Sequence, residues 1–258
     1  MDLGIKDRVA VVTGGSRGLG RQAALSLANE GVKIAICGRT SATLDKTVGE
    51  ISLLGVSAIG IVADITDVDA LKRIKDAVGK DLGTIDILVN NAGGRRGGPG
   101  FDETSRSEFR ENFELNVFGA MDLIRLVLPD MKRNHWGRII NIASIWGREH
   151  GGAIGYMSAK SALIGATKHL ALELAEHNIL VNSIAPGSIK HPGGTWEKFT
   201  EENPPQVVDE FIKQNLPLGK FGWPEPIGDT VAFLASEKAG LITGACINVD
   251  GGQTRSLI

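Results

Sequence analysis

Short apolar runs alternate along the chain with longer segments in which apolar and polar residues follow a helical period. We interpret seven runs as strands: RVAVVT (8–13), KIAIC (33–37), SAIGIVA (57–63), IDILVN (85–90), RIINIAS (138–144), ILVNSIAP (179–186) and CINVDGG (246–252). Helix-like segments lie between most of them, such as 21–30, 43–54 and 68–80. A parallel pair of strands needs a crossover, which is usually a helix. The pattern therefore predicts an α/β fold, a doubly wound parallel sheet of about seven strands.

One segment, residues 187–226, departs from this alternation. It is rich in proline and glycine and carries Trp196, Phe199, Phe221 and Trp223. A long irregular connection is uncommon in a compact domain and often serves as a lid or a binding loop. No repeat, low-complexity tract or linker interrupts the rest of the chain. We predict a single domain over residues 1–258, with a substrate loop inserted at 187–226.

The composition narrows the classes of partner. With 258 residues, 42% of them hydrophobic and 22% charged, the chain can bury a full core. The net charge is -2, and Lys and Arg are scattered, so no basic tract follows a nucleic acid backbone and no polybasic segment anchors a membrane. We expect neither nucleic acid nor membrane as a partner.

The compartment is indicated by two further features. No stretch approaches the ~18 apolar residues of a spanning helix, and the N-terminus lacks an apolar run long enough for a secretion signal. Cys37 and Cys246 lie far apart in apolar runs, without a disulfide framework or a metal-binding spacing. We expect a cytoplasmic protein without a bound metal.

The first chemical motif is TGGSRGLG at residues 13–20, directly after the first strand and before a helix that we expect to begin near Arg21. Glycines at 14, 18 and 20 allow a tight turn and let backbone N–H groups approach a pyrophosphate. The helix N-terminus adds partial positive charge. A Rossmann-type dinucleotide site is indicated, with a plain glycine turn as the alternative.

The end of the second strand indicates which dinucleotide binds. An acidic residue there would bind the 2′-hydroxyl of NAD, but the sequence reads Cys37-Gly38-Arg39-Thr40, and Arg17 lies in the glycine loop. Guanidinium groups bind phosphate oxygens in a fork, which favours the 2′-phosphate of NADP. The alternative is that both arginines are solvated surface charges.

Together these motifs resemble the short-chain dehydrogenase/reductase family, in its shorter single-domain branch, over almost the whole chain. Further shared motifs are Asp64 after the third strand, NNAG at 90–93, Pro186-Gly187 and VDGG at 249–252. Asn116, Ser144, Tyr156 and Lys160 match the family's catalytic positions. The resemblance implies an NADP (NADPH) site made by Gly14, Ser16, Arg17, Gly18, Leu19, Gly20, Arg39, Asp64, Ile65, Asn91, Ala92, Gly93, Tyr156, Lys160, Pro186, Gly187 and Ile189.

The chemistry of the last catalytic pair follows from helix geometry. Tyr156 is the only tyrosine, and Lys160 lies four residues later, on the same face of a helix. The pKa of a phenol, ordinarily ~10, must fall by ~2 to 3 units for proton exchange near neutrality. This shift corresponds to a stabilisation of the phenolate by ~3 to 4 kcal/mol. A cation ~5 Å away, at an effective dielectric constant of ~20, contributes ~3 kcal/mol. We therefore expect Lys160 alone to lower the pKa of Tyr156 almost far enough.

Ser144 and Asn116 complete the predicted set. Ser144 ends a strand, where its hydroxyl can stabilise charge that develops on a substrate oxygen. In the family, the residue at the position of Asn116 distorts a helix and holds a water that links the lysine to solvent. The resemblance implies reduction of a carbonyl to a secondary alcohol, with Tyr156 as the acid. Taken singly, such residues more often form turns or pack in cores.

The substrate is less well defined. The tail and overall pattern most resemble 3-oxoacyl-[acyl-carrier-protein] reductases, but His135 and His177 replace arginines that dock the acidic carrier. Twelve residues separate Ser144 from Tyr156, where thirteen is common, and a nicotinamide-contacting threonine is missing after Pro186-Gly187. Arg95 and Arg96 either bind an acidic substrate or are solvated, and His150 is a candidate substrate contact.

Alternative functions remain open. An NAD(P)-dependent sugar or polyol dehydrogenase fits the same motifs, and a catalytically silent nucleotide-sensing protein would not need Tyr156 and Lys160. Epimerases and dehydratases of this type are longer, with a C-terminal substrate domain for which the chain lacks room. The family usually forms homotetramers, and small residues on the Tyr156 helix allow close helix packing: Ala159, Ala162, Gly165 and Ala166.

Overall fold

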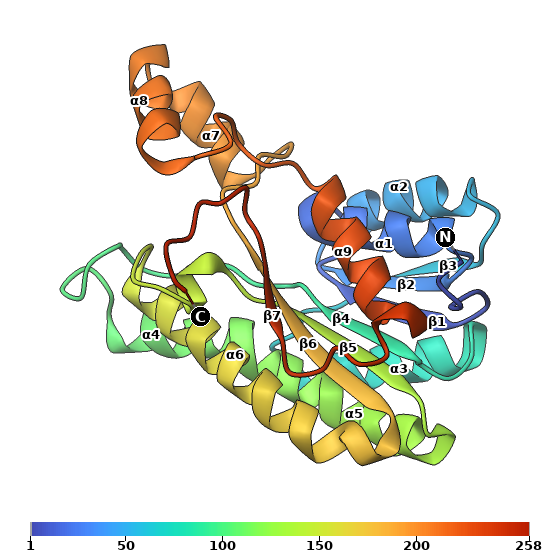
Figure 1. Cartoon of the computed structure of the whole chain (residues 1–258). Helices are drawn as coiled ribbons and strands as arrows, with labels where there is room; N and C mark the ends of the chain where they lie inside the picture. The colour runs from blue at the N-terminus through green and yellow to red at the C-terminus, as the bar shows by residue number, and fades with distance from the viewer. Residues whose placement is uncertain (1, 258) are drawn as a thin grey trace.

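Each of the seven predicted apolar runs overlaps one strand in the computed structural model, which describes residues 2–257. The strands are β1 (Val9–Thr13), β2 (Lys33–Gly38), β3 (Ala58–Val62), β4 (Ile87–Asn90), β5 (Gly137–Ile142), β6 (Ile179–Pro186) and β7 (Cys246–Val249). They form one parallel sheet in the order β3-β2-β1-β4-β5-β6-β7 (Figure 1). The predicted doubly wound α/β fold is confirmed.

The strand order reverses between β1 and β4. From β1 the chain proceeds outward through β2 to β3, then returns to place β4 on the other side of β1. Loops at the carboxyl ends of β1 and β4 therefore leave in opposite directions and open a crevice, where ligands of such sheets bind. The fold places the predicted glycine loop at this crevice.

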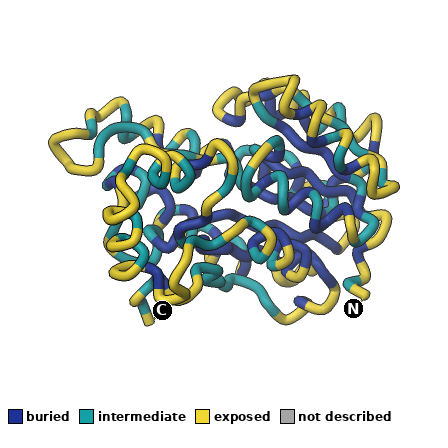
Figure 2. Tube along the Cα trace, turned by 90° about the horizontal axis from the view of Figure 1, so that it is seen from above, coloured by how far each residue is buried: buried dark blue, intermediate teal, exposed yellow. Residues whose placement is uncertain are grey.

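Helices cover both faces of the sheet (Figure 1). One face carries α1 (Gly18–Asn29), α2 (Ser41–Ser52) and α9 (Glu225–Ala235). The other carries α3 (Val68–Asp81), α5 (Gly119–Asn134) and α6 (Ile154–Leu174), and α4 (Arg106–Phe113) packs against α6. Figure 2 shows buried backbone through the middle of the molecule and exposed segments around it.

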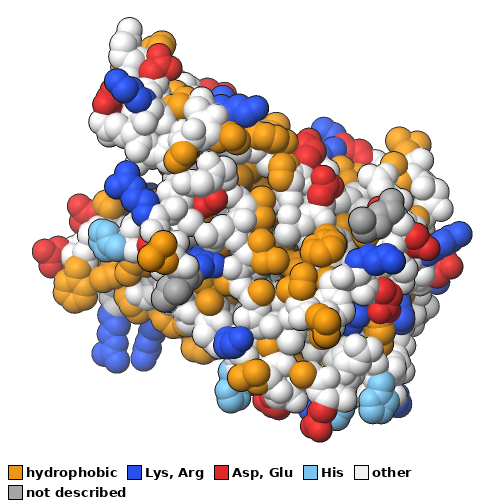
Figure 3. Space-filling model, in the orientation of Figure 1, with side chains coloured by type: hydrophobic (Ala, Val, Ile, Leu, Met, Phe, Trp, Pro, Cys, Tyr) orange, Lys and Arg blue, Asp and Glu red, His pale blue; other side chains and the backbone are white. Residues whose placement is uncertain are grey.

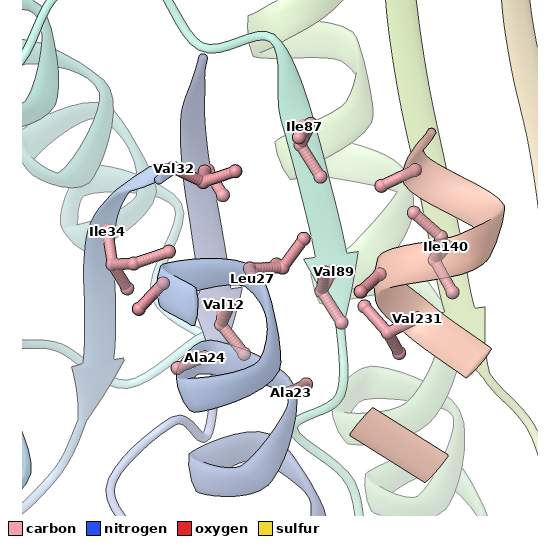
Figure 4. Packing of buried hydrophobic residues seen from close by; sticks show 14 of the residues in the cluster. Val12, Ala23, Ala24, Leu27, Val32, Ile34, Ile87, Val89, Ile140 and Val231 are labelled. Carbon is pink, nitrogen blue, oxygen red and sulfur yellow. The ribbon is translucent and has the colours of Figure 1, made fainter. Parts of the chain in front are cut away.

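Successive strand residues enter opposite cores, because side chains alternate across a strand. On the face shown in Figure 4, Val12 and Ile140 pack with Leu27 of α1 and Val231 of α9. Val11 belongs to the core on the opposite face. Each fully buried aliphatic side chain contributes about 1.5 to 3 kcal/mol. Burial on both faces explains why the strands appear in the sequence as continuous apolar runs.

The insertion at 187–226 is more regular than the sequence predicts. It contains α7 (Thr195–Glu202) and α8 (Pro205–Asn215), which stand away from the sheet in Figure 1 and overhang the rest of the molecule in Figure 3. Four rings hold the two helices together, with centroids of neighbouring rings 4.9–5.8 Å apart. The cluster consists of Trp196, Phe199, Phe211 and Phe221. The aromatic residues noted in the sequence thus form a small core of their own.

Two other predicted helices differ in detail. Helix α1 begins at Gly18 rather than near Arg21, because the last glycines of the loop already form its first turn. The helix that carries Asn116 contains a π-helix, η1 (Glu114–Phe118), which links α4 to α5. Short 3₁₀ turns occur at η2 (Ile145–Gly147), η3 (Ala175–His177) and η4 (Glu237–Ala239).

The described residues include neither a membrane-spanning helix nor a metal-binding cluster. Between residues 2 and 257, no helix has both the length and the apolar character needed to cross a membrane. The same range contains no cluster of three or more His, Cys, Asp or Glu side chains arranged to hold a metal ion.

Candidate active site

The four candidate catalytic residues meet beyond the carboxyl end of β5. Ser144 follows this strand and begins η2, Asn116 lies in η1, and Tyr156 and Lys160 lie in the first two turns of α6. Ser144, Asn116 and Lys160 are buried, and Tyr156 is half-buried. The fold thus brings together residues that the chain separates by up to three elements, α5, β5 and η2.

Tyr156 and Lys160 share one face of α6, as the spacing predicts. The Nζ atom of Lys160 lies 5.6 Å from the centroid of the Tyr156 ring. The same Nζ donates a hydrogen bond of 2.7 Å to the carbonyl oxygen of Ile142, the last residue of β5. The end of the strand therefore fixes the ammonium beside the phenol.

Burial dominates the ionisation of this pair. Burial raises the pKa of Tyr156, and a hydrogen bond with Ser144 acts to lower it. Burial lowers the pKa of Lys160 from 10.5 to about 8. The expectation that Lys160 alone lowers the pKa of Tyr156 is wrong for the protein by itself, because both charged forms lose their hydration.

Asn116 occupies the helix distortion that the family resemblance implies. Its Nδ2 donates 2.8 Å hydrogen bonds to the carbonyl oxygens of Gly94 and Asn112, and its Oδ1 accepts one of 3.1 Å from the Gly94 N–H. A Cβ atom on Gly93 would lie 2.7 Å from Asn116 Oδ1 and 3.1 Å from Lys160 Nζ. Gly93 thus leaves open the space between the asparagine and the lysine.

Asn116→Ala is expected to lower the free energy of unfolding by about 2 kcal/mol or more, because it leaves polar groups of Gly94 and Asn112 without their partner. Urea denaturation measures the change. Asn215→Ala is the matched control, since the Asn215 amide bonds only the carbonyl four residues earlier on the exposed helix α8. Equal effects of the two variants would contradict this assignment.

The glycine loop forms a cradle between β1 and β4. Gly14 and Gly18 have φ values of +63° and +55°, which favour glycine. A Cβ atom on Gly20 would lie 2.3 Å from Asn91 Nδ2 and 2.4 Å from the Gly14 oxygen. Asn91 Nδ2 also donates to the Thr13 and Gly14 carbonyls, which ties this loop to the NNAG segment. A narrow cradle at the start of α1 fits the pyrophosphate of a dinucleotide.

Asp64 and Arg39 lie together beyond β2 and β3. Hydrogen bonds from the Thr66 N–H and hydroxyl, at 3.0 and 2.8 Å, reach Asp64 Oδ1. The backbone bond is the main cause that holds the pKa of Asp64 below its usual value, and the charges of Arg39 and Arg96 act in the same direction. Arg39 itself is exposed and free to meet a ligand.

Arg17 contacts the insertion. Its Nη1 donates a 3.1 Å hydrogen bond to the Gly193 oxygen. The sequence predicts that this guanidinium binds the 2′-phosphate together with Arg39. The exposed side chain ties the glycine loop to the insertion.

His191 also lies at this site, beside Gly18, although it is not among the site residues predicted from the sequence. A Cβ atom on Gly18 would lie 2.7 Å from its Cε1 and 2.8 Å from its Nε2, so the imidazole covers the first turn of α1. The sequence offered one signal for His191: the run after Pro186-Gly187, which contains it, lacks the threonine that usually contacts the nicotinamide.

The remaining candidates surround this cradle or lie apart from it. Arg96 pairs with Glu111 at 3.6 Å, while Arg95 and His150 are exposed. The other predicted cofactor residues are buried or half-buried, with Leu19 in the first turn of α1 and the rest in segments at or after the carboxyl ends of strands: Ser16, Leu19, Ile65, Ala92, Pro186, Gly187 and Ile189.

Comparisons with known proteins agree with this geometry. The family model described as short chain dehydrogenase matches residues 8–203. The chain is 37% identical over 260 residues to 3-oxoacyl-[acyl-carrier-protein] reductase FabG of Aquifex aeolicus, covering 98% of this chain and 100% of the relative. It is 35% identical over 252 residues to (2S)-[(R)-hydroxy(phenyl)methyl]succinyl-CoA dehydrogenase subunit BbsD of Thauera aromatica, covering 98% of each.

Solved structures show the same fold. L-sorbose reductase from Gluconobacter frateurii, complexed with NADPH and L-sorbose, superposes with a TM-score of 0.93 at 31% identity over 100% of both chains. A 7α-hydroxysteroid dehydrogenase, complexed with NADH and 7-oxo glycochenodeoxycholic acid, gives 0.89 at 32% identity, covering 100% of this chain and 98% of the other.

Proposed function

The chain belongs to the short-chain dehydrogenase/reductase family, and from this premise we propose that it reduces a small ketone or 3-oxoacyl group to a secondary alcohol with NADPH. An oxidoreductase that acts on CH–OH or C=O groups with a nicotinamide cofactor follows from the family. The observation that carries the proposal is the joint placement of Ser144, Tyr156 and Lys160 beside the glycine cradle.

The chain's own residues divide the chemistry among them. Ser144 Oγ would donate a hydrogen bond to the carbonyl oxygen, and Tyr156 would protonate that oxygen as the alcohol forms. Lys160 stabilises the tyrosinate that remains, and Asn116 supports the adjoining backbone. NADPH, when bound, supplies the hydride to the carbonyl carbon. Burial of Tyr156 suits the role of an acid, because it keeps the phenol protonated until the substrate oxygen needs the proton.

The preference for NADP over NAD is the finer part of the proposal. The solved relatives include one complex with NADPH and one with NADH, so the family alone does not decide. Arg39 supports NADP because it is exposed beyond β2, where the second strand of this fold meets the adenosine ribose. No acidic side chain occupies residues 37–40.

Arg39→Ala is expected to raise the dissociation constant of NADPH about tenfold and to leave that of NADH within about twofold, because only the 2′-phosphate loses a charged hydrogen bond. Titration of the cofactor's fluorescence gives both constants. Arg125→Ala, an exposed arginine on α5 paired with Asp122, is the control. A parallel loss of NADPH and NADH affinity would contradict the assignment of Arg39.

The substrate class is supported from two directions. The FabG relatives favour a 3-oxoacyl thioester, and the L-sorbose reductase structure favours a sugar ketone as the second candidate. The rings of His135 and His177 lie 6.1 Å apart at the amino ends of β5 and β6, opposite the candidate catalytic residues. Within one chain this pair does not border the site, which weakens docking of a carrier protein there.

The test is NADPH consumption with a panel of 3-oxoacyl thioesters, small ketones and ketoses. Turnover with at least one member supports carbonyl reduction, and the ratio of kcat/KM between thioester and ketose separates the two candidates. Tight NADPH binding without turnover of any member would favour the nucleotide-sensing alternative.

Two further properties accompany the proposal. Two free cysteines, with burial raising the pKa of Cys37 to about 12, support a cytoplasmic protein whose thiols stay reduced. A homotetramer is supported by α6, where Gly165 is exposed and faces open space. Sedimentation at micromolar protein concentration tests the oligomer.

A further inference from the structure

The end of the chain connects the segments that surround the candidate catalytic residues. After β7, the dark red trace in Figure 1 turns back and descends towards the start of α6. We call residues 250–257 the tail. The tail contacts the loop between Ser144 and Tyr156 and also both ends of the insertion at 187–226.

Glu149 holds the far end of the tail. Its Oε2 accepts hydrogen bonds from the backbone N–H groups of Arg255 and Ser256, at 2.7 and 2.9 Å. Bonds to an ionised acceptor are about twice as strong as neutral ones. The neighbouring Arg148 donates to the Cys246 carbonyl of β7, which anchors the same loop a second time. The loop before Tyr156 is therefore fixed to the last two segments of the chain.

Gln253 holds the near end of the tail. Its Oε1 accepts a 2.7 Å hydrogen bond from the Ser188 N–H, and its Nε2 donates one of 2.9 Å to Ser188 Oγ. Both residues are buried. Since Ser188 is the second residue of the insertion, this clamp sets the direction in which the insertion leaves β6.

The turn between these two contacts is preformed. The Asp250 carboxylate accepts hydrogen bonds from the N–H groups of Gly252 and Thr254, both within 3.0 Å. A Cβ atom on Gly187 would lie 2.7 Å from Asp250 Cβ, so only glycine leaves room for the tail at the start of the insertion. At the far end of the insertion, Leu218 packs against the same turn, 3.1 Å from where a Cβ on Gly251 would lie.

We propose that the tail forms one wall of the substrate entrance, beside the loop before Tyr156 and the insertion. In this proposal Glu149 is a positioning residue, a latch that sets substrate affinity by holding the tail in place. The inference rests on the proposed carbonyl reduction. Its physical basis is that one short segment joins the two loops that differ most from the family pattern, the short loop before Tyr156 and the insertion. The tail thus gives the two loops a shared set of contacts, through which a change in one can reach the other.

The latch separates substrate binding from chemistry. Glu149 contacts the tail and not Tyr156 or Lys160, so its loss should loosen the entrance without altering the proton donor. Glu149→Ala is therefore expected to raise KM for the carbonyl substrate about tenfold, with kcat and the NADPH dissociation constant within about twofold. Glu149→Gln keeps an acceptor oxygen and should recover most of the affinity.

A double-mutant cycle distinguishes this latch from a general loss of stability. Removal of residues 255–258 deletes the two N–H donors, so adding Glu149→Ala to the truncated chain should raise KM no further. Hydrogen exchange of the Arg255 and Ser256 amides should quicken in Glu149→Ala, but not in Glu173→Ala, an exposed glutamate on α6 that serves as control.

Three results would overturn the proposal: an unchanged KM in Glu149→Ala, additive effects of substitution and truncation, or unchanged exchange at residues 255–256. Absence of turnover in the wild-type protein with every carbonyl substrate would refute the proposed function instead. The exchange measurement decides the latch in that case too, because it needs no substrate.

Discussion

Tyr156→Phe is expected to lower kcat by about 10³-fold, because it removes one hydroxyl and with it the only phenol of the chain. The ring of phenylalanine keeps the contact with Lys160, whose Nζ lies 5.6 Å from the ring centroid. The variant should therefore fold normally and bind NADPH with an affinity within about twofold of the wild type. Steady-state kinetics and cofactor titration measure the two quantities on one preparation.

The control for this variant is Met157→Leu, at the next position of α6, which changes neither the hydroxyl nor the charge. Its kcat should remain within about twofold of the wild type. Normal turnover of Tyr156→Phe would remove Tyr156 from the chemistry. An equal loss in both variants would mean that helix packing, not proton transfer, had been disturbed.

Lys160→Met is expected to lower kcat by about 10²-fold or more and, at the same time, to stabilise the protein. Burial lowers the pKa of Lys160 from 10.5 to about 8, so the buried ammonium costs about 3 kcal/mol at neutral pH. Loss of its hydrogen bond to the Ile142 oxygen offsets about 1 kcal/mol. We expect a net gain of about 2 kcal/mol at pH 7, measured by urea denaturation.

The pH dependence of this gain has a definite sign. Between about pH 8 and pH 10.5, the unfolded chain holds a proton on Lys160 that the folded protein has released. Wild-type stability therefore rises with pH relative to that of the variant, and the gain shrinks over this window. Lys168→Met, which replaces an exposed lysine on the same helix, is the control. A gain that stays constant from pH 7 to 10 would contradict the burial of Lys160's charge.

The effects expected for these two variants reflect a site whose catalytic residues reduce the stability of the protein. A buried lysine beside a half-buried phenol is unfavourable for both charged forms, and the surrounding sheet and helices hold the pair in place. The sequence alone indicates the pair by its spacing of four residues. It does not indicate that burial outweighs the attraction between them, because burial depends on segments distant in the chain, including the strand that ends at Ile142.

The sheet could be predicted almost completely from the sequence. The central strands are buried on both faces and are therefore mostly apolar, and each apolar run of the sequence overlaps one strand. Helix boundaries were less certain, as at Gly18, where the glycine that forms the loop also begins α1. The π-helix at Asn116 depends on hydrogen bonds to Gly94, a contact that no local pattern reveals.

The insertion and the tail show where prediction from local pattern ends. Proline and glycine between residues 187 and 226 indicate a loop, but packing of four aromatic rings produces two helices there. The sequence places Glu149 in the loop between Ser144 and Tyr156 but does not indicate its partners. Its partners lie more than 100 residues later, at 255 and 256, and become apparent only when the chain is folded.

In the proposed reaction, this site transfers a hydride from NADPH to a carbonyl carbon, with Tyr156 supplying the proton. The most direct measurement is a single-turnover reaction with NADPH deuterated at C4 of the nicotinamide and the best carbonyl substrate of the panel, followed by mass spectrometry of the product. We expect deuterium on the carbinol carbon of the product with the wild-type protein, and at most a trace over the same time with Tyr156→Phe. Labelled alcohol formed equally fast by both proteins, or labelled NADPH left unconsumed by the wild type with every substrate, would contradict the proposed reaction.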